Sequence, residues 1–265
     1  MTTHHTTASL RGKKQGLTNV ARQELRKTID EIDAYYKRIS KLPKKQFHDL
    51  LVSDPSLSEY QQVCLHNWLL AREIDLASLK SSSIRKMDKL LVEEYFDEFA
   101  KKPYDEEIRV GQIRLFSPQI LPNCTRPVTF SVVANWDKTD GDELKLIAPY
   151  GRYPEPAMPG EFRTGRPFEY SLCDPNFSVL CLWNSYTVPT DVLTKSWLID
   201  VVKEDELDDA WEVWKHVSLG GELPTRLAER VGPQILSKFD PREAYQKEEL
   251  DLLRPILKHF LSRYY

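Results

Sequence analysis

The residues best placed for chemistry surround Cys181, in the stretch Ser178 to Leu193, which reads SVLCLWNSYTVPTDVL. A nucleophilic thiol needs a base or a cationic neighbour, and the local sequence offers no candidate. The β-type run from Val179 to Trp183 fits a buried strand better, with Asn184 as its polar exit. Pro189 keeps such a strand from continuing at a sheet centre. We therefore interpret Cys181 as a core residue.

Motifs of the common catalytic and metal-binding families are absent from the sequence. It contains no glycine-rich phosphate loop, no Gly-x-Ser-x-Gly elbow and no His-Glu-x-x-His. Cys64, Cys124, Cys173 and Cys181 form no Cys-x-x-Cys pair, so a zinc site has little support. We expect no cofactor, no metal and no assignable catalytic residue. An enzyme whose site is assembled from distant residues is kept as an alternative.

Five large aromatic residues lie close together in the sequence, and they are candidates for a protein-binding surface. They are Trp183, Tyr186, Trp197, Trp211 and Trp214. Tryptophan and tyrosine dominate the energetic hot spots of protein interfaces. The same clustering is typical of a core where strands meet helices, so the burial of the rings decides between the two interpretations.

Basic residues suggest a second kind of partner, a nucleic acid. Arg152, Arg163 and Arg166 fall in a proline-rich loop with aromatic residues, and this combination can bind nucleic acid by charge and stacking. It can equally fix a long loop to the fold through cation–π contacts and hydrogen bonds. Lys13 and Lys14 belong to an N-terminal segment of 45 residues with eleven Lys/Arg and four Asp/Glu.

The first hundred residues are predicted to be helical after a disordered polar tail at 1–16. Apolar residues at three- and four-residue steps predict an antiparallel helical bundle over 17–102. Ser58-x-x-Gln61 reads as a capping box that opens one of these helices. The apolar face of that helix is wide: it contains Tyr60, Cys64, Leu65, Trp68, Leu69, Leu70 and Ala71. This width predicts burial on more than one side.

Short β-like runs separated by prolines predict a different architecture over 104–265. Asp140-Gly141 predicts a hairpin turn between two of the runs, and six or seven strands suggest a small antiparallel barrel or sandwich. Helices are predicted again after the strands. One begins with a cluster of acidic residues at Glu204, and the last one begins at Pro241. The predicted fold class is α+β: an N-terminal antiparallel helical bundle, then the barrel or sandwich, closed by C-terminal helices.

The C-terminal part resembles poorly characterised bacterial proteins linked to sigma factors, including accessory proteins of type III-E CRISPR systems. The segments that carry the resemblance are LWNSYTVPTDVLTKSWLIDVV, GGELPTRLAERVGPQI and DPREAYQKEE, within about residues 179–249. None of them contains a catalytic motif. The resemblance implies a cytoplasmic regulatory or adaptor protein that acts through protein contacts, in transcription control or CRISPR-based defence.

Composition sets the remaining expectations. The chain has a net charge of −3, 41% hydrophobic and 29% charged residues, which is typical of a soluble globular protein. No signal-peptide core occurs in the first thirty residues and no run is long enough to cross a membrane, so we expect no membrane partner, a reducing cytoplasm and free thiols. A non-enzymatic protein-interaction protein is the first hypothesis, ahead of a nucleic-acid binder and an enzyme.

Overall fold

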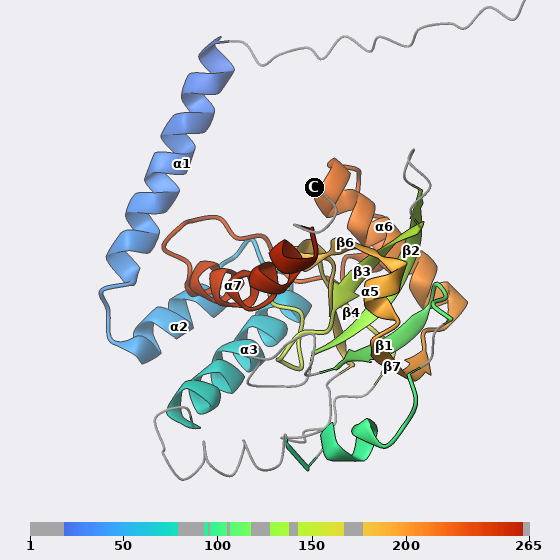
Figure 1. Ribbon diagram of the computed structural model, residues 1–265. Coiled ribbons are helices and arrows are strands. Elements are labelled where there is room, and N and C mark those ends of the chain that lie inside the picture. Colours follow the sequence, from blue (N-terminus) through green and yellow to red (C-terminus); the bar gives the residue numbers. More distant parts are fainter. Residues whose placement is uncertain are drawn as a thin grey trace, which may run out of the picture.

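The structure of the chain is a computed structural model that describes residues 19–78, 93–94, 96–104, 107–117, 128–137, 143–166 and 177–261. Its fold class is α+β, as predicted, because helices pack beside an antiparallel sheet (Figure 1). The tail at 1–16, which was predicted to be disordered, lies outside the described residues.

Three helices open the described part of the chain: α1 (Asn19–Ile39), α2 (Lys44–Val52) and α3 (Glu59–Ser78). The predicted capping box precedes α3. The backbone N–H of Gln61 donates to Ser58 Oγ and that of Ser58 donates to Gln61 Oε1, each at 3.2 Å. These bonds satisfy donors that the first turn of a helix leaves without intrahelical partners.

Five strands form one antiparallel sheet in the order β6-β3-β2-β1-β7. They are β1 (Gln112–Phe116), β2 (Thr129–Asp137), β3 (Glu143–Pro149), β6 (Tyr186–Pro189) and β7 (Ser196–Val201). A separate antiparallel pair consists of β4 (Glu161–Arg163) and β5 (Val179–Cys181). The long pairing of β2 with β3 fits the predicted hairpin, whose Asp140-Gly141 turn lies outside the described residues.

The five-stranded sheet is open, so its predicted closure into a barrel is not supported. Its two edges are β6 and β7, which do not pair with each other. One face is covered by α6 (Glu204–Leu219), whose Val213 and Trp214 pack in one cluster with Ile113 and Leu146 of the sheet. A helix therefore buries the apolar face that a barrel would bury by closing on itself.

Local signals set both ends of α6. Its first turn carries Glu204, Asp205 and Glu206, whose negative charges are favoured at the N-terminal end of the helix dipole. Gly220 ends the helix in the left-handed conformation, with φ at 71°, and its N–H donates to the carbonyl of His216 at 3.1 Å. Glycine is the residue best suited to this position because it has no Cβ.

The opposite face of the sheet has a core of its own. Phe116 of β1 and Phe130 of β2 stack with their ring centroids 4.2 Å apart. Leu193 of α5 (Thr190–Leu193) and Leu253 of α7 (Pro241–Leu261) pack in the same cluster. Both faces of the sheet are therefore buried within the chain.

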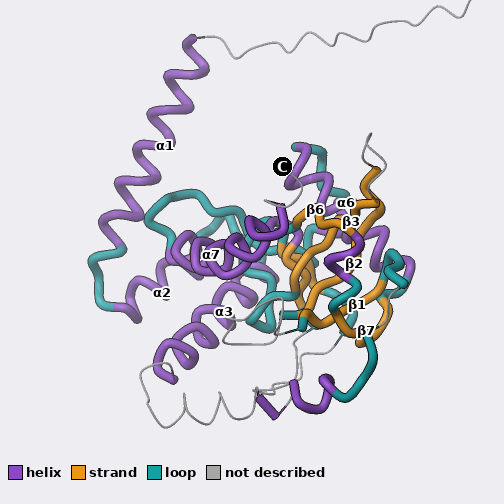
Figure 2. The backbone as a smooth tube through the Cα atoms, in the orientation of Figure 1, coloured by secondary structure: helices purple, strands orange, loops and turns teal. Residues whose placement is uncertain are grey.

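A third core joins the N-terminal helices to the rest of the molecule. Its centre is Trp68 of α3, whose ring meets that of Tyr153 at 5.7 Å and that of Tyr245 of α7 at 5.5 Å. Figures 1 and 2 show α7 beside α2 and α3, on the side of the molecule opposite to α6. Packing therefore crosses the boundary that the sequence predicts near residue 103.

A tight turn at 157–161 supports this third core. Pro159 and Gly160 occupy its two central positions, and the N–H of Glu161 closes it on the carbonyl of Met158 at 3.0 Å. Gly160 has φ at 78°, a conformation that glycine adopts without strain. The N–H of Gly232 donates to the carbonyl of Glu161 at 3.2 Å, so the two backbone segments lie in direct contact.

We expect Gly232→Ala to destabilise the protein by about 3 kcal/mol, because the added Cβ would lie 2.5 Å from the carbonyl oxygen of Met158. The free energy of unfolding in urea measures this loss. Gly221→Ala is the control, since its Cβ would lie no closer than 3.6 Å to a neighbouring backbone atom. Equal stability of the two variants would show that the 157–161 turn can move away at little cost.

Candidate functional site

The predicted aromatic cluster divides between separate places in the fold, and Trp197 belongs to a core. It is buried, and its ring packs against Phe99 and Tyr104, with centroids 5.7 and 5.0 Å away. Its Nε1 donates to the carbonyl of Lys102 at 3.2 Å. The indole thus has a hydrogen-bond partner and apolar neighbours within its own chain, as a core tryptophan requires.

Trp211 and Trp214 form a second group with Trp136, which the sequence analysis did not include. Trp214 is buried, stacks on Trp211 at 4.7 Å and meets Trp136 edge-on at 5.5 Å. Its Nε1 donates to Ser185 Oγ at 2.9 Å. Trp136 lies far away in the sequence, on β2, so only the sheet topology brings it to α6. These three rings lie at the edge of the core between α6 and the sheet.

Trp183 and Tyr186 follow the end of β5, but they pack in different places: Trp183 lies against the third core and Tyr186 against the core that contains Phe116 and Phe130. The strand ends at Cys181, two residues earlier than expected, and a 3-10 turn over Leu182–Asn184 follows it. The hydroxyl of Tyr186 donates to Asn184 Oδ1. Cys181 is buried, as its interpretation as a core residue requires. The five aromatic residues therefore do not make one continuous surface.

The three arginines of the proline-rich loop are all engaged within the chain. Arg152 pairs with Asp75 at 2.5 Å and Arg166 with Asp200 at 2.5 Å. Arg163 pairs with Glu155 and lies over the ring of Tyr60, 5.2 Å from its centroid. Each guanidinium charge is thus balanced by a carboxylate, which leaves little for a phosphate backbone. These contacts fix the loop to α3 and β7; Lys13 and Lys14 lie outside the described residues.

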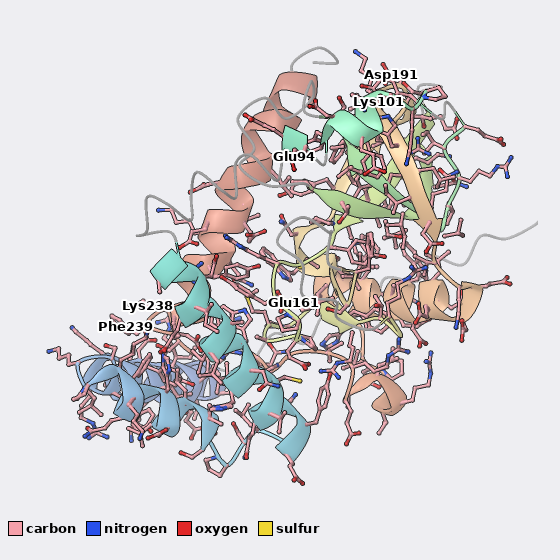
Figure 3. All side chains as sticks on the ribbon, turned by 90° about the horizontal axis from the view of Figure 1, so that it is seen from below. Glu94, Lys101, Glu161, Asp191, Lys238 and Phe239 are labelled. Carbon is pink, nitrogen blue, oxygen red and sulfur yellow. The ribbon has the colours of Figure 1, made fainter. Side chains whose placement is uncertain are left out.

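Glu161 is a buried carboxyl that the sequence analysis missed, and it lies in the interior of the molecule (Figure 3). Its Oε2 accepts the N–H groups of Ala157 and Met158 at 2.8 and 3.2 Å, and the thiol of Cys181 donates to Oε1 at 3.8 Å. Burial raises the pKa of Glu161 to about 7, against the opposing effect of these backbone N–H groups. Its position within a predicted loop gave no sign of burial.

The chemistry available to Glu161 is limited by its surroundings. A pKa near 7 would suit a general acid or base. Its oxygens, however, are occupied by the backbone of the 157–161 turn and by Cys181, all of which are buried. We therefore interpret Glu161 as the group that holds this turn in place.

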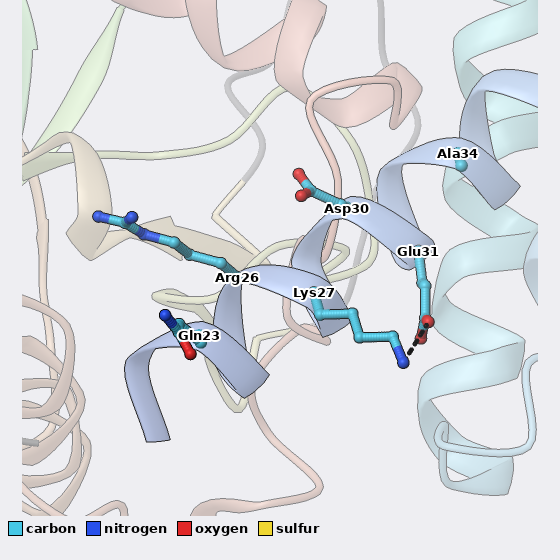
Figure 4. A pocket seen from close by; sticks show the side chains of 6 residues that line it. All are labelled: Gln23, Arg26, Lys27, Asp30, Glu31 and Ala34. Atoms are coloured by element: carbon cyan, nitrogen blue, oxygen red, sulfur yellow. Dashed lines mark ion pairs between the residues drawn. The ribbon is translucent and has the colours of Figure 1, made fainter. Parts of the chain in front are cut away.

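A shallow hollow lies along one side of α1. Its lining residues are Gln23, Arg26, Lys27, Asp30, Glu31 and Ala34. All come from a single helix, and Figure 4 shows them along its outer side, with Lys27 paired to Glu31 at 3.8 Å. One helix surface cannot enclose a small ligand as concave binding sites do. We therefore do not assign a ligand site to this hollow.

The outer face of α3 is the strongest candidate for a functional surface. Val63, Leu70 and Ile74 are 53, 46 and 62% exposed, whereas Cys64 and Trp68 on the inner face are buried. The steps of seven and four residues place the three exposed side chains on one side of the helix. The sequence predicted burial of α3 on more than one side, and this prediction is wrong for Leu70, which belonged to the predicted wide face.

Ion pairs and a cation–π contact border this outer face on both sides. On one side Glu73 pairs with Lys44 of α2 at 2.9 Å, and Nδ1 of His48 lies 3.2 Å from the same carboxylate. On the other side Asp75 pairs with Arg152, while Tyr60 lies beneath Arg163. An apolar strip between fixed polar borders is the arrangement of core and rim found in protein interfaces.

Metal and membrane sites have no support in the described part of the chain. No group of three or more His, Cys, Asp or Glu side chains there could hold a metal ion. None of its helices is both long and apolar enough to cross a membrane.

Comparison with known proteins identifies no relative: no protein family, curated protein or solved structure matches the chain. The resemblance over residues 179–249 stays a prediction.

We expect the stability of the protein to fall as pH rises from 4.5 to about 7, because buried Glu161 keeps its proton in this window while the unfolded chain releases it. At about 1.4 kcal/mol per pKa unit, the loss is on the order of 3 kcal/mol. Urea unfolding at several pH values measures it. Glu161→Gln should lose this dependence, and the exposed Glu222→Gln should keep it. Parallel pH profiles for wild type and Glu161→Gln would refute the assignment.

Proposed function

We propose that this chain is a non-enzymatic protein-interaction protein whose partner covers the outer face of α3. The observation that carries the proposal is the row of exposed apolar side chains, Val63, Leu70 and Ile74, on a helix whose inner face is already buried. Isolated exposed apolar residues are common on protein surfaces, but an ordered row bordered by ion pairs is characteristic of an interaction site.

The spacing of the row favours a helical partner. With Asn67, the positions 63, 67, 70 and 74 follow alternating steps of four and three residues. This is the pattern by which one helix packs its side chains between those of another. A polar residue such as Asn67 within such a seam fixes the register of the two helices at some cost in stability.

The biological setting also belongs to the proposal. A regulatory or adaptor role in the bacterial cytoplasm, in transcription control or CRISPR-based defence, is supported by the resemblance of residues 179–249. That segment lies apart from α3 in the sequence. The setting and the interaction surface are therefore independent parts of the proposal.

We expect Ile74→Glu and Leu70→Glu to weaken partner binding by about tenfold or more, because each places a charge in the centre of an apolar interface. The test is to purify the tagged chain from cells that express it naturally and to measure its affinity for the co-purified, identified partner. Leu219→Glu, at an exposed apolar residue on the last turn of α6, is the matched control. Undiminished binding by both α3 variants would contradict the proposed surface.

A further inference from the structure

We propose that the partner on the outer face of α3 is a second copy of this chain, and that two copies exchange their α1 helices reciprocally. The α1 helix of each copy then lies along the Val63, Leu70 and Ile74 row of the other. This inference rests on the proposed function, since it names the occupant of the same surface.

Apolar residues line one side of α1 from Leu25 to Ile39, and this row, the α1 seam, extends beyond the third core. Tyr36 and Ile39 are buried in the third core, whereas Leu25 and Ile29 are 51 and 47% exposed. With Ile32, these positions follow the same steps of four and three residues as the row on α3. Figure 1 shows the N-terminal half of α1 extending away from the body of the molecule. The described part of the chain therefore leaves this half of the seam uncovered, and a second copy can cover it.

The row on α3 is short compared with α1. From Val63 to Ile74 the row spans eleven residue steps, about 16 Å at 1.5 Å per residue. The α1 helix has 21 residues, and Leu25 and Ile29 are exposed on its seam, while Ile32 packs against the third core. One α1 helix can thus cover the whole exposed row of an α3 helix.

Charge favours α1 against α3 over two α3 helices against each other. Arg22 and Arg26 are exposed beside the α1 seam, and Figure 4 shows Arg26 extended away from Asp30. Glu59 is exposed in the first turn of α3. The cation of α3, Arg72, is already held by Glu248 at 2.6 Å, so α3 has no described cation to offer a second α3.

Reciprocal exchange covers the α1 seam and the α3 row of both copies at once. A two-fold dimer forms the α1–α3 contact twice, so neither copy keeps either of these two strips open. A stable interface buries about 1,000 Å² or more in total, which two helix contacts reach more readily than one. A separate helical partner on α3 would leave Leu25 and Ile29 exposed.

The oligomeric state of the purified full-length protein gives the first test, by light scattering after size-exclusion chromatography. We expect a dimer for wild type and for the control Leu219→Glu. Ile29→Glu and Ile74→Glu should each raise the dissociation constant by about tenfold or more while leaving the far-ultraviolet circular dichroism unchanged. A dimer that neither variant weakens would overturn the exchange.

Disulfide trapping gives the second test and identifies the contacting helices. One chain carries Ile29→Cys and the other carries Ile74→Cys. In both chains Cys124 and Cys173 are replaced by serine. The native Cys64 and Cys181 are kept because they are buried. Oxidation should give a covalent dimer from the mixture and none from either chain alone. Covalent dimers from Ile29→Cys alone or from Ile74→Cys alone would show like helices in contact and overturn the exchange.

The two proposals fail in different ways. A monomeric wild type whose separate, identified partner is lost with Ile74→Glu would overturn the exchange and leave the proposed function standing. A monomeric wild type whose partner is retained by both α3 variants would overturn both.

Discussion

The mutual packing of the Trp68, Tyr153 and Tyr245 rings joins three segments that lie far apart in the sequence. It fixes α3 both to the long loop and to α7. Arg72 reinforces the same junction, since it donates to the hydroxyl of Tyr153 at 3.2 Å and pairs with Glu248. Because one face of α3 is held inward in this way, the face that carries Val63, Leu70 and Ile74 must point outward.

The loop that meets Trp68 is itself held by buried polar groups. Arg242 pairs with Asp240 at 2.6 Å and donates to the carbonyls of Ala157 and Pro233, at 2.6 and 3.1 Å. Glu161, at the end of the same turn, accepts the N–H groups of Ala157 and Met158. A buried ion pair such as Arg242–Asp240 adds little net stability but is costly to disrupt, which favours a single loop conformation. Buried hydrogen bonds and an ion pair therefore stabilise the junction at Trp68, in addition to its apolar contacts.

Features set by local sequence could be predicted, and features set by distant contacts could not. The Ser58/Gln61 capping box and the glycine stop at Gly220 depend on a few neighbouring residues, and both are present. Closure of the sheet depends on which distant elements cover its faces. The sequence therefore predicted a barrel or sandwich, whereas α6 buries one face of an open sheet. Periodicity predicted one wide apolar face on α3, but only the packing of Trp68 determines that Val63, Leu70 and Ile74 lie on the exposed side.

Side-chain footprinting by hydroxyl radicals tests the central claim most directly, because it measures the exposure of α3 side chains in the assembled protein. At concentrations that favour association, we predict that Leu70 and Ile74 react as slowly as buried Leu65 and become reactive on dilution. Leu219 should react equally at all concentrations. Reactivity of Leu70 and Ile74 as high as that of Leu219 under every condition, with and without co-purified protein, would show that the outer face of α3 is never covered.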